Sequence, residues 1–186
     1  DRAERVAKLL LGDTFHSGWG IRTVCDRELR YNPMSYHNGS VWPHDNALIG
    51  AGFGQYGMRD AALRVMMGLF DASLFTDLHR LPELFCGFVR RRGEGPTQYP
   101  VACSPQAWSS AAVFYLLQAV LGMSIRSDPP SIRFFRPLLP RNVREVDIEN
   151  LRVGDASVDV TLVRHAEDIG IHVRRRCGEV QVTVIK

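Results

Sequence analysis

Apolar and polar residues follow two different patterns along this chain, and the change falls near residue 123. Before it, apolar residues recur every three or four positions, which is typical of amphipathic helices. Glycine often follows a helix end, and Gly12, Gly57 and Gly122 stand at such places. The spacing predicts helices over about 2–11, 44–56, 59–75 and 104–121.

The fourth predicted helix has the clearest start. Ser104 can cap it, and Pro105 suits a first helical turn. Its residues are apolar on most sides, so we expect the helix, including Trp108, to be largely buried.

Beyond Ser124 apolar and polar residues alternate in short runs that turn residues separate. The runs are 132–135, 146–151, 158–163, 169–173 and 180–184. Such alternation predicts an antiparallel sheet. We therefore predict a mainly α fold with a β tail: a helical domain over 1–123 and a small antiparallel β appendage over 124–186.

Composition narrows the possible partners. Net charge is +3, and the arginine clusters at 90–92 and 174–176 are short and lack interleaved aromatics, so no nucleic-acid partner is predicted. No apolar run approaches the ~18 residues of a transmembrane helix, and no leader pattern opens the sequence, so no membrane partner is predicted either.

The four cysteines are widely spaced, and together with the histidines they match no common zinc pattern. We predict no metal and no cofactor. Without a secretory signal the cysteines are interpreted as reduced thiols, which favours a cytoplasmic location.

The polar, glycine-rich stretch at 13–43 is long for a connection inside a compact domain, and such loops are usually functional or disordered. Its aromatic and asparagine residues argue for an ordered, functional loop.

Three motifs carry a family resemblance. They read YHNGSVWPHDNALI at 36–49, LPELFCGF at 81–88 and YPVACSPQAWS at 99–109. In order and spacing they resemble bacterial amylo-α-1,6-glucosidase-like proteins of the glycogen-debranching type, and the stretch at 151–159 resembles the β-rich tail of those proteins. The resemblance implies a partial (α/α)6 toroid of the six-hairpin glycosidase type, followed by the β-sheet region.

The resemblance also implies a reaction, the inverting hydrolysis of α-glucosidic bonds in an oligosaccharide or polysaccharide. It assigns the general base to Glu83. A base must be ionised at neutral pH, which an ordinary glutamate with a pKa of roughly 4.3 already is. Residue types alone allow a structural alternative, since a glutamate after proline suits the first turn of a helix.

By the same resemblance Trp42, His44 and Asp45 line a sugar subsite, with Asn38 and Gln106 as further contacts. An indole offers an apolar face to a pyranose, while histidine and aspartate can hydrogen-bond hydroxyl groups. Asp45 also has a structural alternative, because a carboxylate in the first turn stabilises a helix.

The chain departs from the family in two respects. No Gly-Trp-Lys-Asp-Ser-like motif supplies the general acid, and Gly18-Trp19-Gly20 shares only a dipeptide with it. The predicted helices are fewer than a full toroid contains, so exposed apolar surface and self-association are expected.

The sequence opens at Asp1 inside a predicted helix, and we expect it to be part of a longer polypeptide. We expect the parent protein to be a glycosidase and the isolated chain to be inactive. The alternatives are a glucan-binding module and a structural module that completes a helical barrel.

Overall fold

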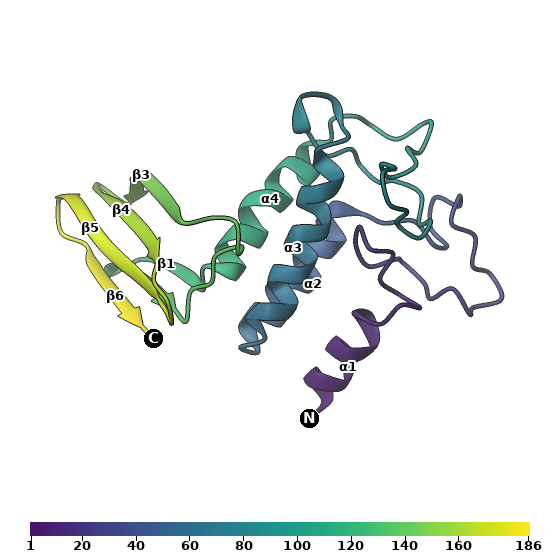
Figure 1. Ribbon diagram of the computed structural model, residues 1–186. Coiled ribbons are helices and arrows are strands. Elements are labelled where there is room, and N and C mark those ends of the chain that lie inside the picture. Colours follow the sequence, from purple (N-terminus) through teal and green to yellow (C-terminus); the bar gives the residue numbers. More distant parts are fainter. The chain divides into compact units, whose positions relative to one another are not determined.

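The computed structural model describes residues 1–186, and the chain divides into two compact units, Asp1–Leu117 and Gln118–Lys186. The division into domains 1–123 and 124–186 stays a prediction. Figure 1 shows the helices and strands in chain order. None of the helices has both the length and the apolar character needed to span a bilayer.

The first unit contains the helices. They are α1 (Arg2–Leu10), α2 (Pro43–Gln55), α3 (Arg59–Ser73), the 3-10 turn η1 (Asp77–His79) and α4 (Ala107–Val120), which runs past the end of the unit. Asp1 caps α1 by accepting the Ala3 N–H, and Pro43 opens α2. These positions agree with the four predicted helices to within a few residues.

Helices α2 and α3 pack side by side (Figure 1) and are joined by a short turn. Gly57 in this turn has φ +78°, a conformation that glycine adopts without a steric penalty. Gly50 of α2 leaves room for Leu116, whose side chain would lie 2.4 Å from a Cβ built there. The core of the unit therefore includes one face of α4.

The prediction that α4 is largely buried is wrong. Ala112 and Leu116 are buried, but Phe114 is 75% exposed and Trp108 is 46% exposed. An apolar helix buries only the faces that meet a neighbour, and the periodicity of α4 does not reveal how many neighbours it has. The helix begins at Ala107, whose N–H is accepted by the Gln106 side chain, so Ser104 is not its cap.

The second unit contains two three-stranded sheets. Its strands are β1 (Met123–Ser127), β2 (Pro130–Phe135), β3 (Glu145–Val153), β4 (Ala156–Arg164), β5 (Ile169–Cys177) and β6 (Gln181–Ile185). One sheet has the order β1-β2-β6 and the other β3-β4-β5. All five predicted strands are present, and β1 is an additional one.

The predicted fold class is wrong. Helices make up 29% of the chain and strands 26%, so the protein is not a mainly α partial toroid with a β tail. The sheet region is not purely antiparallel either, because β2 and β6 pair in parallel. The four predicted helices are present, but the segments at 11–42 and 80–106 contain turns and isolated β-bridges and add no further helix of the kind a toroid requires.

Candidate active site

Two loops cross in the first unit and bring the first two sequence motifs together. Val41 and Phe85 exchange backbone hydrogen bonds, with N···O distances of 3.0 and 3.1 Å. A Cβ built on Gly87 would lie 1.7 Å from the carbonyl oxygen of Gly39, so only glycine allows the two backbones to approach this closely. The crossing places residues 36–45 beside residues 81–88.

Asn46, near the start of α2, connects this helix to the loop region around Ile21. Its buried amide accepts the Ile21 N–H at 2.7 Å and donates to the carbonyl oxygens of Ile21 and Trp42 at 3.0 and 2.9 Å. The start of α2 is thereby tied to the long loop that precedes it.

Arg22 from the same loop is buried as well. It donates to the carbonyl oxygens of Gly87, Asp13 and Thr14. The loop at 13–43 is therefore anchored to both neighbouring segments, as expected for an ordered loop.

Glu83 is 9% exposed, and both oxygens of its carboxylate accept hydrogen bonds. The Tyr36 hydroxyl donates to Oε1 at 2.7 Å, and the Cys103 N–H donates to Oε2 at 3.3 Å. The Glu83 backbone N–H in turn donates to the Cys103 carbonyl at 2.8 Å. The hydrogen bond to Glu83 and partial desolvation raise the pKa of Tyr36 to about 12, because both disfavour a phenolate.

An aromatic cluster extends from Tyr36 to α4. Trp42 lies edge-on to Tyr36, with ring centroids 4.8 Å apart, and edge-on to His44 at 5.6 Å. His44 stacks on Trp108 at 4.2 Å. Rings from the loop at 36–42 and from two helices thus form a continuous series of contacts that starts at Tyr36, the partner of Glu83.

His44 and Asp45 make an ion-pair contact, with 3.0 Å between Nε2 and Oδ1. The Nδ1 atom of His44 is buried and has no partner within the chain. Asp45 is about half exposed, so one charged group at this end of the cluster faces solvent.

The structure brings four of the six predicted site residues into one region. Glu83 reaches Trp42 through Tyr36, Trp42 contacts His44, and His44 holds Asp45. Trp42 itself is only 7% exposed, and its Nε1 donates to Ser40 Oγ and to the Tyr36 carbonyl.

The other two predicted residues have different surroundings. Asn38 lines a separate hollow with Thr23, Glu28 and Arg30. Gln106 uses its side-chain oxygen to accept the Ala107 N–H at the start of α4. No group of three or more His, Cys, Asp or Glu side chains is arranged to hold a metal ion.

Sequence reasoning did not single out Tyr36, Asn46 or Arg22. Tyr36 and Asn46 both stand inside the first motif, so the motif held a signal for them. Trp108 was interpreted as core, and its exposure depends on what packs against α4, which a single sequence does not reveal.

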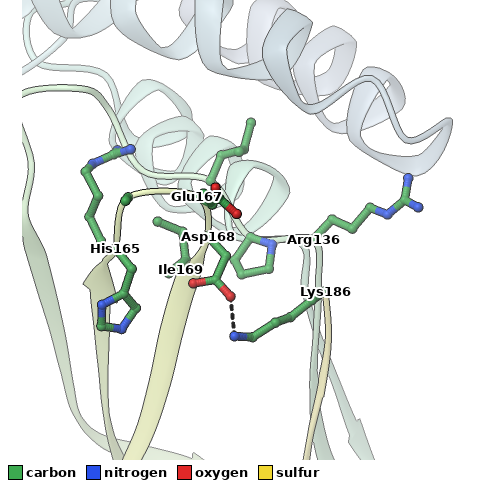
Figure 2. A pocket seen from close by; sticks show the side chains of 10 residues that line it. Arg136, His165, Glu167, Asp168, Ile169 and Lys186 are labelled. Atoms are coloured by element: carbon green, nitrogen blue, oxygen red, sulfur yellow. Dashed lines mark hydrogen bonds and ion pairs between the residues drawn. The ribbon is translucent and has the colours of Figure 1, made fainter.

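A hollow in the second unit holds none of the predicted residues. Figure 2 shows it with Arg136, His165, Glu167 and Asp168 on its walls and an ion pair between Asp168 and Lys186. The hydrogen bond from Lys186 holds the pKa of Asp168 below its usual value. The charges here are mixed and largely exposed, which sets this hollow apart from the buried carboxylate of the first unit.

The comparison with known families adds to this geometry. Residues 1–77 match the family model described as the mannosylglycerate hydrolase MGH1-like glycoside hydrolase domain. The match supports a glycoside hydrolase of the six-hairpin type. It includes Trp42, His44 and Asp45 and ends before Glu83. No curated protein matches the chain.

The glycosidase-like match suggests a carbohydrate substrate. It does not single out an amylo-α-1,6-glucosidase among glycoside hydrolases.

Proposed function

We propose that this chain supplies the general-base side of an inverting glycoside hydrolase, with Glu83 as the base. The observation that carries the proposal is the buried, doubly hydrogen-bonded carboxylate of Glu83 beside a cluster of aromatic rings. In such a reaction a water oxygen bonds to the anomeric carbon, the glycosidic C–O bond breaks, and the carboxylate takes the proton from water.

We propose α-glucosidic bonds, including α-1,6 branch points, as the target. The motifs at 36–49, 81–88 and 99–109 support this choice through their resemblance to amylo-α-1,6-glucosidase-like proteins. The name of the matching family points instead to mannosylglycerate, so an α-mannoside is the competing substrate.

Trp42, His44 and Asp45 are proposed to line the sugar subsite. The 3.0 Å contact between His44 and Asp45 keeps the two groups together, and the neighbouring rings offer apolar surface to the C–H face of a sugar. For Asn38 and Gln106 we propose more distant contacts, since their neighbours differ from those of Glu83.

The leaving group requires a general acid, and the sequence offers no motif for one. We therefore expect the 186-residue chain not to hydrolyse maltooligosaccharides or aryl α-glucosides. Glycosyl fluorides are different, because fluoride is a weakly basic leaving group that needs little protonation. If the base site is formed, the chain should hydrolyse α-glucosyl fluoride.

The test measures fluoride release from α-glucosyl fluoride and α-mannosyl fluoride by the wild-type chain and by Glu83→Gln. Release by the wild type and its loss in Glu83→Gln are the expected results, and the preferred fluoride identifies the sugar. Equal rates in both proteins would reject Glu83 as the base. Sugar binding by calorimetry without any fluoride release would favour the binding-module alternative.

A further inference from the structure

Tyr36, on the loop at 36–42, lies against the carboxylate of Glu83. The two residues are 47 positions apart in the sequence, and the loop crossing at Val41 and Phe85 brings them together. The 2.7 Å hydrogen bond from the Tyr36 hydroxyl is the shorter of the two bonds to this carboxylate, since the Cys103 N–H lies 3.3 Å from the other oxygen.

The ring of Tyr36 is held on several sides. Trp42 and His37 lie edge-on to it, with centroids 4.8 and 4.7 Å away, and Tyr99 approaches at 5.5 Å. A phenol enclosed in this way has little freedom to swing away from its acceptor.

The Tyr36 backbone is held as well. Its carbonyl oxygen accepts hydrogen bonds from Ser40 Oγ at 2.6 Å and from Trp42 Nε1 at 3.2 Å. These bonds hold the Tyr36 backbone in place, so its hydroxyl is directed at Glu83. One of them comes from Trp42, the indole that is predicted to contact the sugar.

We propose that Tyr36 is a positioning residue for the base: it fixes Oε1 of Glu83 and leaves Oε2 to take the proton from the attacking water. This inference rests on the proposed function. Oε2 is the better candidate because its bond to the Cys103 N–H is long and weak, so it has lone-pair density available. In the step, water oxygen bonds to the anomeric carbon, the leaving group departs with its bonding electrons, and Oε2 receives the proton.

The same geometry links sugar binding to catalysis. A displacement of Trp42 would be transmitted through Tyr36 to the carboxylate, because the Trp42 indole donates to the Tyr36 carbonyl and lies edge-on to the Tyr36 ring. Small errors in the placement of a base reduce the rate of the chemical step more than they reduce substrate affinity.

The test is Tyr36→Phe, which keeps the ring and removes the hydroxyl, assayed with the glycosyl fluoride that the wild-type chain prefers. We expect kcat to fall about 10- to 100-fold with KM nearly unchanged. The control is Tyr31→Phe, which removes a tyrosine hydrogen bond to the carbonyl oxygen of Gly87 in the same segment without touching Glu83. The control should keep the wild-type kcat.

A second measurement does not depend on turnover. The Tyr36 phenol, followed by NMR of its ring carbon, should titrate near pH 12 in the wild type and closer to its ordinary value in Glu83→Gln. Titration of Tyr36 at its ordinary value in both proteins would overturn the inference.

Failure of the positioning role of Tyr36 can be distinguished from failure of the proposed function. Wild-type kcat in Tyr36→Phe together with an inactive Glu83→Gln would overturn the positioning role and keep the proposed function. Full activity in Glu83→Gln would overturn the proposed function itself. If no fluoride is released by any variant, the proposed function fails, and the NMR titration alone decides whether Tyr36 holds the carboxylate.

Discussion

The imidazole of His44 stacks on the indole of Trp108, with ring centroids 4.2 Å apart and planes inclined by 20°. Trp108 is nevertheless 46% exposed, whereas the neighbouring Trp42 is only 7% exposed. The tryptophan with free surface is therefore the one that sequence reasoning assigned to the core. Because of this exposure we propose Trp108 as a further sugar contact, in addition to Trp42.

Replacing Trp108 by alanine should weaken sugar binding by about 10-fold, the order expected for losing one aromatic contact surface. Calorimetric titration with maltooligosaccharides measures this. Phe114→Ala is the matched control, because Phe114 is also an exposed aromatic of α4 but has no ring contact with His44 or Trp42. An equal loss of affinity in both variants would argue against a specific role for Trp108.

The loop crossing should be intolerant of any side chain at Gly87. A Cβ there would lie 1.7 Å from the Gly39 carbonyl oxygen, so the two loops would have to separate. We expect Gly87→Ala to lower the free energy of unfolding by about 3 kcal/mol, the upper range for overpacking.

Gly52→Ala is the matched control for that experiment. Gly52 lies inside α2, and a Cβ there would have no atom within 4 Å. The substitution should raise the free energy of unfolding by about 0.5–1 kcal/mol, because alanine favours helix more than glycine does. Urea unfolding of both variants gives the two values, and equal changes of the same sign would show that the crossing imposes no constraint.

The parts of the fold that could be predicted from the sequence are those with a local signal. Helices α2 and α3 follow from apolar spacing with Gly57 between them, and β2 to β6 follow from alternation between turns. The parallel pairing of β2 with β6 has no local signal, since it joins segments about fifty residues apart. The exposure of α4 was missed for a related reason, because the number of neighbours of an apolar helix depends on the rest of the chain.

The candidate site also has one part with a local sequence signal and one part without. The first motif supplied Trp42, His44 and Asp45, which are consecutive or nearly so and share the start of α2. The partner of Glu83 could not be predicted, because Tyr36 reaches it only after the loops have crossed. Such long-range hydrogen bonds follow from the fold as a whole, and residue types do not reveal them.

Asn46 illustrates such a contact and gives a further prediction. Its side chain makes three hydrogen bonds, two of them to the backbone of Ile21, and it is fully buried. Asn46→Ala would leave the buried N–H and C=O of Ile21 without partners, at a cost of about 1–3 kcal/mol for each unsatisfied group. Urea unfolding should show a loss of at least this size.

Asn46→Asp separates the two kinds of bond. The carboxylate can still accept the Ile21 N–H, but it can no longer donate to the two carbonyl oxygens. The Asn46→Asp variant should therefore be less stable than the wild type. The loss should be greater at pH 7 than at pH 4, because a buried negative charge would then face those carbonyls. If Asn46→Ala unfolds at the wild-type urea concentration, the tie between α2 and the long loop is not a source of stability.

His16 should make the stability of the protein depend on pH. Burial, followed by the nearby charges of Arg64 and Arg22, lowers its pKa to about 4 from the ordinary 6.5. Its Nδ1 accepts the Gly18 N–H at 3.0 Å, an interaction that only the unprotonated nitrogen can make. The folded state therefore favours neutral His16.

The sign of the effect follows from proton uptake. Between pH 6.5 and about 4 the unfolded chain binds a proton at His16 and the folded chain does not, so the free energy of unfolding rises with pH in this window. The contribution is fully present above pH 6.5 and is lost as the pH falls to about 4. Its full size is of order 3 kcal/mol.

Other groups titrate in the same window, so the measurement must be a difference between two proteins. His16→Asn keeps an acceptor for the Gly18 N–H and cannot be protonated there. Its free energy of unfolding, measured by urea titration at pH 7, 5.5 and 4, should fall less steeply with decreasing pH than that of the wild type. His172→Asn, at an exposed position of β5, should keep the wild-type slope. If the free energy of unfolding has the same pH dependence in the wild type and in His16→Asn, His16 is protonated equally well in the folded and unfolded chain. Its burial would then make no contribution to the pH dependence of stability.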